Sequence, residues 1–266
     1  MGSDSTERHF GLTRRNLVKS LGVTGVAGLA GCMSGDGTDT ETDGPGAGGG
    51  NTTTPADPSN AQEGGELIAS FGADVAQFDP ASSTDTTSVK ALSLTFENLL
   101  TVGFDGSINN ALAHTFEEVD EENNIWRAEL REGVMFHNGT ELTAEDVQVS
   151  FERYEGTPNA ADVYNWYDSS EIIDDYTIEF TLQDTYAPLQ FDISAVGIVP
   201  AAAENGDLDL SENPVGTGPY EFVEHQPDEL FRIERYDDYW FEGDDNVPAT
   251  APIETVTYRI ITEQSA

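Results

Sequence analysis

The chain has 266 residues, of which 50 are acidic and 11 basic, giving a formal net charge of −39 at pH 7. This charge argues against a nucleic-acid partner, because phosphate binding needs clustered lysine and arginine. The chain contains one cysteine, so no internal disulfide can stabilise the fold.

The carboxylates are spread along the whole chain, and Lys19 and Lys90 are the only lysines. We interpret this composition as the surface of a salt-adapted protein from a salt-loving archaeon, in which concentrated salt screens the self-repulsion of the chain. An ordinary acidic secreted protein is the alternative. Unfolding measured against salt concentration separates the two, since full stability in dilute buffer would contradict salt adaptation.

Residues 1–32 are predicted to be an export signal, because basic residues precede an uncharged run at 20–33 that is too short to be a good membrane span. Around Arg14 and Arg15 the sequence resembles the twin-arginine signal, with Leu17 where phenylalanine is common. This resemblance implies export of a folded protein.

Cys32 follows Leu-Ala-Gly, which resembles a lipobox. The resemblance implies cleavage before Cys32, lipidation of its thiol and anchoring on the outer face of the cytoplasmic membrane. A cysteine that merely lies in a hydrophobic signal segment is the alternative.

Residues 33–65 are rich in glycine, threonine and aspartate and contain no aromatic side chain, so we expect a disordered acidic tether. A flexible coil of this length has a root-mean-square span of roughly 30 Å. Asn51 lies in an Asn-x-Thr sequon and is a possible glycosylation site, which an unshifted peptide mass would refute.

The folded part is predicted to cover residues 66–266, with a first strand at 67–71 between two glycines. Apolar spacing predicts a helix over 89–100, and alternation predicts half-buried strands. These strands are expected at 126–130, 178–182, 220–223, 231–234 and 256–260, with a short helix at 200–204. The mixture predicts an α/β domain with a mixed sheet and flanking helices.

Residues 130–153 combine a strand end, a turn and a helix start. We expect residues 135–137 to leave a strand and Asn138-Gly139 to form the turn. Thr143 is the predicted N-cap, with Glu145 and Asp146 in the first turn, where carboxylates suit the exposed N–H groups. An apolar stripe follows on one helix face and must be covered by the fold: Ala144, Val147, Phe151 and Tyr154.

Two further motifs lie towards the end of the chain. Residues 213–220 read Asn-Pro-Val-Gly-Thr-Gly-Pro-Tyr, and residues 235–240 read Arg-Tyr-Asp-Asp-Tyr-Trp. The glycines at 216 and 218 lack the spacing and the lysine of a phosphate-binding loop. Backbone geometry is therefore their better explanation.

The three segments 130–153, 213–220 and 235–240 occur in the same order in the extracellular solute-binding protein family 5, which this chain resembles over residues 66–266. Members deliver oligopeptides, dipeptides or nickel to ABC importers. The resemblance implies a periplasmic-binding-protein-like (type II) α/β lobe. Family chains are about twice as long, so we expect an N-terminal half without the second lobe, or a fragment with no activity of its own.

The resemblance also implies partners and excludes catalysis. The expected partners are a peptide or other small solute, ABC permease subunits and the membrane through a lipid anchor, with the protein itself a monomer. It implies no cofactor and no metal of its own unless the solute is a metal complex.

Four residues are candidates for the solute pocket. Phe78 and Asp79 follow the first strand, where α/β sheets place ligands, although Asp79 could equally cap a turn before Pro80. Trp166 and Tyr167 could form an aromatic wall, with a place in the core as the alternative.

A secreted hydrolase is the rival function. The sequence has no G-x-S-x-G or H-E-x-x-H motif, and His114, His137 and His225 are isolated from one another. Nearby acidic pairs carry little weight, because they arise by chance among fifty carboxylates. We therefore predict no catalytic residues.

Overall fold

A computed structural model of the chain describes residues 64–103, 105–204, 206–242 and 251–262. Contacts between Cα atoms divide the chain into Met1–Thr52 and Thr53–Ala266, and all described residues belong to the second unit. The predicted export signal, Cys32 and Asn51 lie outside the described residues.

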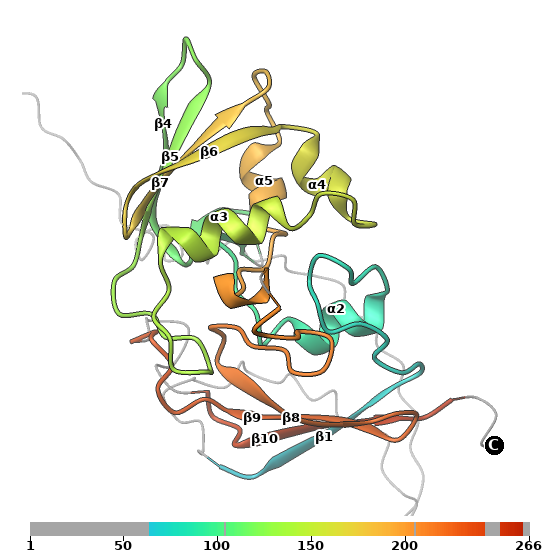
Figure 1. The fold of residues 1–266 in the computed structure, drawn as a ribbon. Coiled ribbons are helices and arrows are strands. Elements are labelled where there is room, and N and C mark those ends of the chain that lie inside the picture. Colours follow the sequence, from blue (N-terminus) through green and yellow to red (C-terminus); the bar gives the residue numbers. More distant parts are fainter. Residues whose placement is uncertain (1–63, 104, 205, 243–250, 263–266) are drawn as a thin grey trace, which may run out of the picture. The chain divides into compact units, whose positions relative to one another are not determined.

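The described residues form runs of short strands separated by short helices (Figure 1). The strands are β1 (Glu66–Phe71), β2 (Leu100–Val102), β3 (Ile108–Asn110), β4 (Ala113–Asp120), β5 (Ile125–Leu130), β6 (Tyr167–Asp174), β7 (Thr177–Leu182), β8 (Tyr220–Gln226), β9 (Leu230–Arg235) and β10 (Thr255–Ile260). The helices are α2 (Thr86–Leu92), α3 (Ala144–Glu152), α4 (Ala160–Tyr164), α5 (Leu189–Ile193) and the 3-10 turn η2 (Ala201–Ala203). In this part of the chain no helix is long and apolar enough to cross a membrane.

The first sheet is mixed and has the strand order β1-β10-β9-β8. β1 runs parallel to β10, with Leu67 opposite Val256, and the other neighbours are antiparallel. Phe231 and Ile233 are fully buried, which follows from the alternation of apolar and polar residues along β9. The predicted pairing of residues 220–223 with 231–234 is confirmed.

The second sheet is antiparallel and has the order β4-β5-β7-β6. Every second residue of β7 is buried, so Ile178, Phe180 and Leu182 face the core. Helix α3 packs against β6 and β7 (Figure 1). β2 and β3 form a separate two-stranded antiparallel sheet.

Helix α3 begins as predicted. The backbone N–H and hydroxyl of Thr143 donate to Oδ2 of Asp146 at 2.7 and 2.9 Å, which is the reciprocal half of a capping box. Oδ1 of Asp146 accepts the N–H of Ala201 at 2.7 Å, so the same carboxylate also fixes η2. The predicted apolar stripe from Ala144 to Tyr154 is buried.

The predicted helix over 89–100 is wrong at both ends. Helix α2 begins at Thr86, because Asp85 caps it by accepting the N–H of Ser88 at 2.8 Å. It ends at Leu92, and the following carbonyls bond to a distant segment rather than to the helix. The N–H of Gly218 donates to Thr95 at 3.0 Å and that of Tyr220 to Leu94 at 3.1 Å. Tertiary hydrogen bonds thus outweigh the helical spacing.

The strand expected to end at residues 135–137 also differs. Strand β5 ends at Leu130, and Met135 forms only an isolated bridge with Glu141. The turn at Asn138-Gly139 closes this bridge, with Gly139 at φ +80°. The turn at Asn138-Gly139 is therefore confirmed. The strand before it ends at Leu130 and does not continue to residues 135–137 as expected.

Gly216 and Gly218 allow two backbones to approach closely. A Cβ atom on Gly216 would lie 2.0 Å from the carbonyl oxygen of Thr95, and one on Gly218 would lie 2.4 Å from that of Leu94. Neither distance is compatible with a side chain. The interpretation of these glycines as backbone geometry is confirmed.

We predict that Gly216→Ala lowers the free energy of unfolding by at least about 1–3 kcal/mol, because the added methyl group clashes with backbone that cannot give way. Gly72→Ala is the matched control, since a Cβ there meets nothing within 4 Å. Thermal unfolding followed by circular dichroism in concentrated salt measures both. Equal melting temperatures for the two variants would contradict the close approach.

Candidate functional site

Glu97 accepts hydrogen bonds from side chains of two distant segments of the chain. Its Oε2 accepts the hydroxyl of Thr217 at 3.0 Å and the indole N–H of Trp240 at 2.7 Å. Its Oε1 accepts the hydroxyl of Tyr239 at 2.8 Å. Burial beside Glu97 raises the pKa of Tyr239 well above its usual range, so this phenol stays protonated and remains a donor.

Burial also raises the pKa of the Glu97 carboxyl above its usual value. The three donors and Arg131 act in the opposite direction without cancelling that effect. Arg131 is held in place by its bond to the carbonyl of Ala111 at 2.6 Å, and its guanidinium lies 5.1 Å from the centre of the Trp240 ring.

His137, in the motif at residues 130–153, connects that motif to the residues around Glu97. Its Nε2 donates to the carbonyl of Gly218 at 2.9 Å, and its ring contacts Tyr236 edge-on. Burial lowers the pKa of His137, and the Gly218 carbonyl opposes this. The three sequence motifs therefore meet in space and hold the fold together. Glu97, Tyr239 and Trp240 also line a separate hollow of about 380 Å³.

A hollow of about 440 Å³ lies beside this cluster, and we call it the α2–α4 hollow. Its volume falls within the range of small-molecule sites. It is lined by residues from five separate segments: Pro80, Ser83, Thr84, Val89, Leu92, Ser93, Phe96, Asn98, Tyr154, Asn159, Asp162, Ser194, Ala195 and Gly197. Phe96 and Asn98 flank Glu97 in the chain, so the Glu97 network positions one wall of the hollow.

The loop between β1 and α2 forms another wall of the hollow and is held in place by hydrogen bonds to Ser88 and Asn159. The Ser88 hydroxyl accepts the N–H groups of Ala76 and Gln77 at 2.9 and 3.2 Å. The amide of Asn159 donates to the carbonyls of Pro80 and Ser83 at 3.3 and 3.0 Å, which ties the loop to the start of α4.

Tyr154 closes the floor of the hollow just beyond α3. Its side chain is buried, and that burial raises the pKa of the phenol far above its usual range, with Asp162 and Asp79 acting in the same direction. The hydroxyl is therefore a neutral group.

Phe78 and Asp79 belong to the predicted loop, but their side chains turn inward. The ring of Phe78 is buried against Phe222 and Phe231. Asp79 accepts the N–H of Ala81 at 3.0 Å and forms an ion pair with Arg153 at 2.5 Å. The turn-cap interpretation of Asp79 thus fits its contacts, and Pro80, Ser83 and Thr84 are the residues of this loop that line the hollow.

Trp166 and Tyr167 are 1% and 4% exposed. Both rings pack against Phe151 and Phe180 in the core under the second sheet. Their contacts favour the core interpretation, because a side chain enclosed in this way offers little surface to a solute.

The sequence reasoning missed the residues that line the hollow. They come from segments up to more than one hundred residues apart, so no spacing in the chain could reveal them. Glu97 did leave a signal, since it is the one acidic residue in the otherwise uncharged stretch from Leu92 to Leu100.

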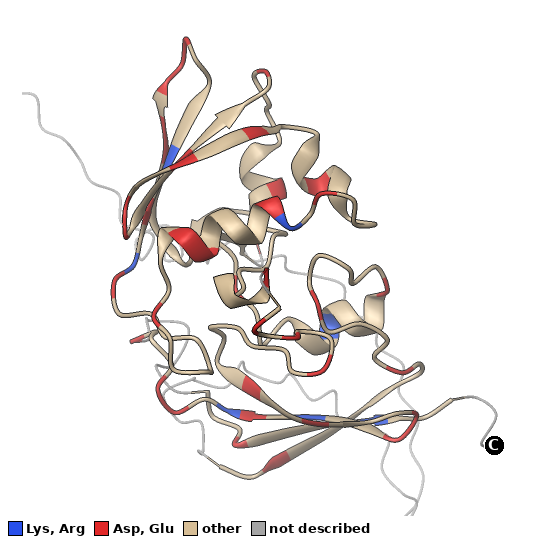
Figure 2. Ribbon diagram, viewed as in Figure 1, with Lys and Arg blue, Asp and Glu red and all other residues tan. Residues whose placement is uncertain are grey.

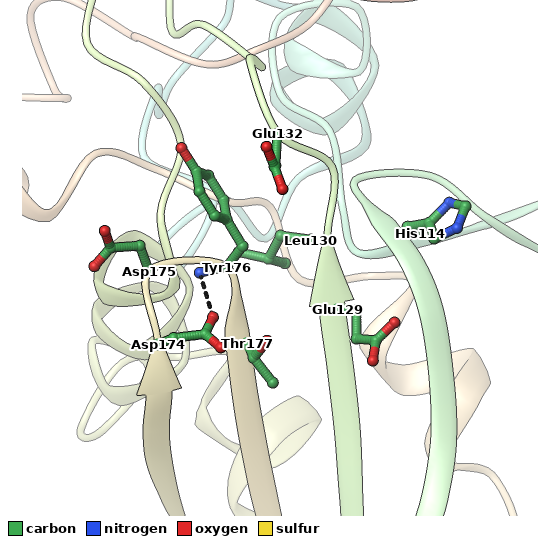
Figure 3. Close-up of a pocket in the computed structure, with 8 residues that line it drawn as sticks. All are labelled: His114, Glu129, Leu130, Glu132, Asp174, Asp175, Tyr176 and Thr177. Carbon is green, nitrogen blue, oxygen red and sulfur yellow. Dashed lines mark hydrogen bonds between the residues drawn. The ribbon is translucent and has the colours of Figure 1, made fainter.

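A larger and more open hollow lies at the ends of β5, β6 and β7 (Figure 3). It is lined by the carboxylates of Glu129, Glu132, Asp174 and Asp175, and the Asp174 carboxylate accepts the N–H of Tyr176 at 3.0 Å in the turn. Among the described residues no group of three His, Cys, Asp or Glu side chains could hold a metal ion. We therefore treat this hollow as a solvated turn region.

Acidic residues lie on both sheets and on the helices, while lysine and arginine are few (Figure 2). Four arginines form ion pairs with carboxylates: Arg127 with Glu179, Arg153 with Asp79, Arg232 with Glu224 and Arg235 with Asp237. Four arginines are thus paired within the fold, and the excess of carboxylates makes the field outside it negative.

Comparison with known proteins places this chain in one family. The sequence profile of the bacterial extracellular solute-binding proteins, family 5 (middle), matches residues 107–266. The chain is 25% identical over 206 residues to the glutathione-binding protein GsiB of Pectobacterium atrosepticum, covering 75% of this chain and 39% of that protein.

Solved structures agree. The periplasmic binding protein DppA from Helicobacter pylori, in complex with the peptide STSA, matches with a TM-score of 0.66 and 29% identity over 76% of this chain and 44% of that one. The oligopeptide-binding protein AppA from Bacillus subtilis, in complex with a nonapeptide, has the same fold with a TM-score of 0.65.

The chain belongs to the extracellular solute-binding proteins of family 5, and its fold is that of a type II periplasmic-binding-protein lobe. It spans about two-fifths of the length of the curated relatives it matches. These relatives are solute-binding proteins rather than enzymes.

We predict that Glu97→Leu lowers the free energy of unfolding by several kcal/mol, since each buried donor left without an acceptor costs about 1–3 kcal/mol. Glu97→Gln keeps one acceptor oxygen and loses less. Glu118→Leu, exposed on β4, removes the same charge and serves as the control. Denaturant unfolding in concentrated salt ranks the variants, and similar values for Glu97→Leu and Glu118→Leu would contradict the role of Glu97.

The same variants test the titration of Glu97. Because the folded protein holds this proton more tightly than the unfolded chain, whose carboxyl has the usual value of 4.5, wild-type stability relative to Glu97→Gln increases as pH falls from the raised pKa towards 4.5. It decreases as pH rises through the raised pKa. A pH-independent difference would show that the pKa is not raised.

Proposed function

We propose that this protein is an extracellular receptor that binds a peptide, or a related small solute such as a nickel complex, and delivers it to an ABC importer. The α2–α4 hollow carries this proposal, because it is a concave site of suitable volume in a chain whose family binds solutes. Its lining mixes apolar side chains with amides and hydroxyls, which suits a peptide.

The relatives favour a peptide as the solute. GsiB binds glutathione, itself a small peptide, and the DppA structure holds the peptide STSA. The permease subunits of an importer are the proposed protein partners, and the receptor is proposed to act as a monomer without a cofactor.

Export through the twin-arginine signal at Arg14 and Arg15, and anchoring through a lipid on Cys32, belong to the same proposal. A lipid anchor would keep the receptor next to the permease on the outer face of the membrane, with residues 33–65 as the tether. The intact mass of protein extracted from native membranes tests this, since an unmodified Cys32 or an uncleaved N-terminus would refute it.

The contacts of the histidines give little support to the rival function, a hydrolase. His225 Nε2 and Asp74 Oδ1 lie 2.8 Å apart, which is the one pairing of a histidine with a carboxylate among the described residues. Asp74 also accepts the N–H of Asp228 at 3.0 Å, and the His225 ring packs against Phe78. The pair links the loop after β1 to the β8–β9 turn, which is a structural role.

We predict that Ala195→Trp, which places a large side chain in the α2–α4 hollow, abolishes stabilisation of the protein by its solute. A ligand at one hundred times its dissociation constant stabilises the folded state by about 2.7 kcal/mol, a shift that thermal unfolding resolves. The screen uses glutathione, the peptide STSA and a nickel–histidine complex in concentrated salt.

Ala187→Trp is the control, because Ala187 is exposed and lies outside the lining of the hollow. A solute that stabilises wild type and Ala187→Trp but not Ala195→Trp supports the hollow as the site. Equal stabilisation of all three proteins would place the solute elsewhere, and hydrolysis of the peptide would favour an enzyme.

A further inference from the structure

The charge of the α2–α4 hollow is set by one side chain. Asp162, in the first turn of α4, is the only residue of the lining that carries a charge at neutral pH, and no lysine or arginine is present there. Because the phenol of Tyr154 is neutral, the lining has a net charge of one carboxylate. A hollow with this charge distinguishes solutes by sign.

Most of the amide donors of the lining residues are used within the protein. The amide nitrogen of Asn159 donates to the Pro80 and Ser83 carbonyls, and that of Asn98 donates to the carbonyl of Ser194 at 2.5 Å. The Ser194 hydroxyl donates to the carbonyl of Phe191 at 2.6 Å.

The serine hydroxyls follow the same pattern. Ser83 donates to the carbonyl of Asp79 at 2.9 Å, and Ser93 donates to that of Lys90 at 2.9 Å. The lining residues also carry the amide oxygens of Asn98 and Asn159 and the carboxylate of Asp162, all of which accept hydrogen bonds, beside one further N–H of Asn98. The hydroxyls of Tyr154 and Thr84 can accept as well as donate. The lining is therefore rich in acceptors.

No arginine among the described residues forms an ion pair with Asp162. Arg153 is engaged by Asp79 at 2.5 Å on the inner side of the loop. Burial and the negative charge of Asp192, on α5, raise the pKa of Asp162, and no bond from a described residue lowers it. The carboxylate is thus left for a partner from outside the protein.

We propose that the α2–α4 hollow holds a cationic nitrogen of the solute, an ammonium or a guanidinium group, against the Asp162 carboxylate. Such a group supplies several N–H donors and a positive charge, which match the acceptors and the charge of the lining. Val89, Leu92 and Phe96 offer an apolar surface for the methylene stem that carries the cation. This inference rests on the proposed function and specifies its solute as a basic peptide or amine.

Two tetrapeptides that differ only in lysine or norleucine at one position test the inference. Both have the same termini and nearly the same volume, so their difference in affinity reports the cation alone. Calorimetric titration of the full chain, at the lowest salt concentration at which circular dichroism shows it folded, is expected to give several-fold tighter binding of the lysine peptide, because higher salt screens the ion pair. In Asp162→Asn the two peptides are expected to bind equally.

Asp168→Asn is the matched control, because Asp168 is exposed on β6, lies outside the lining, and its substitution removes the same charge from an acidic protein. It is expected to keep the preference for lysine. A preference that survives in Asp162→Asn, or that disappears equally in both variants, would overturn the inference, since it would then come from the overall charge.

The remaining outcomes separate this inference from the proposed function. Equal binding of both peptides to wild type overturns the cation site and leaves the receptor function standing. Binding of neither peptide, at every position tested for lysine, overturns both. Circular dichroism of each variant confirms that its fold is intact before the titrations are compared.

Discussion

The enclosed carboxylate of Glu97 is the interaction on which the described fold depends most. Its three donors lie more than one hundred residues away along the chain, on the turn before β8 and on the segment after β9. Thr217 is fully buried, and Tyr239 and Trp240 are partly buried, so the loss of this one acceptor would leave several polar groups unpaired at once. Because Phe96 and Asn98 flank Glu97, the same network fixes one wall of the hollow.

This arrangement separates the residues that identify the family from those that would select a solute. His137, Thr217, Tyr239 and Trp240 belong to the three motifs, and all four bond to the Glu97 network or to the glycines beside it. The hollow is lined by residues outside those motifs. The side chains that pack the motifs together are therefore different from those proposed to contact the solute.

Much of the fold could be predicted because its signals are local. The alternation of apolar and polar residues predicted β5, β7, β8, β9 and β10. Thr143 and Asp146 predicted the start of α3. The helix expected over 89–100 failed because backbone groups at Leu94 and Thr95 bond to Gly218 and Tyr220. No periodicity within a short window contains that information, and the same holds for the inward position of Phe78.

The sequence by itself determined the acidic character of the protein, its local turns and caps, and its resemblance to solute-binding proteins, because each is written in neighbouring residues. Only the tertiary structure decided that Asp79 pairs with Arg153, that Trp166 and Tyr167 are core residues, and that Asp162 faces a hollow. Those properties depend on which distant segments pack together. A side chain's exposure and its partners are set by that packing, which composition and spacing do not encode.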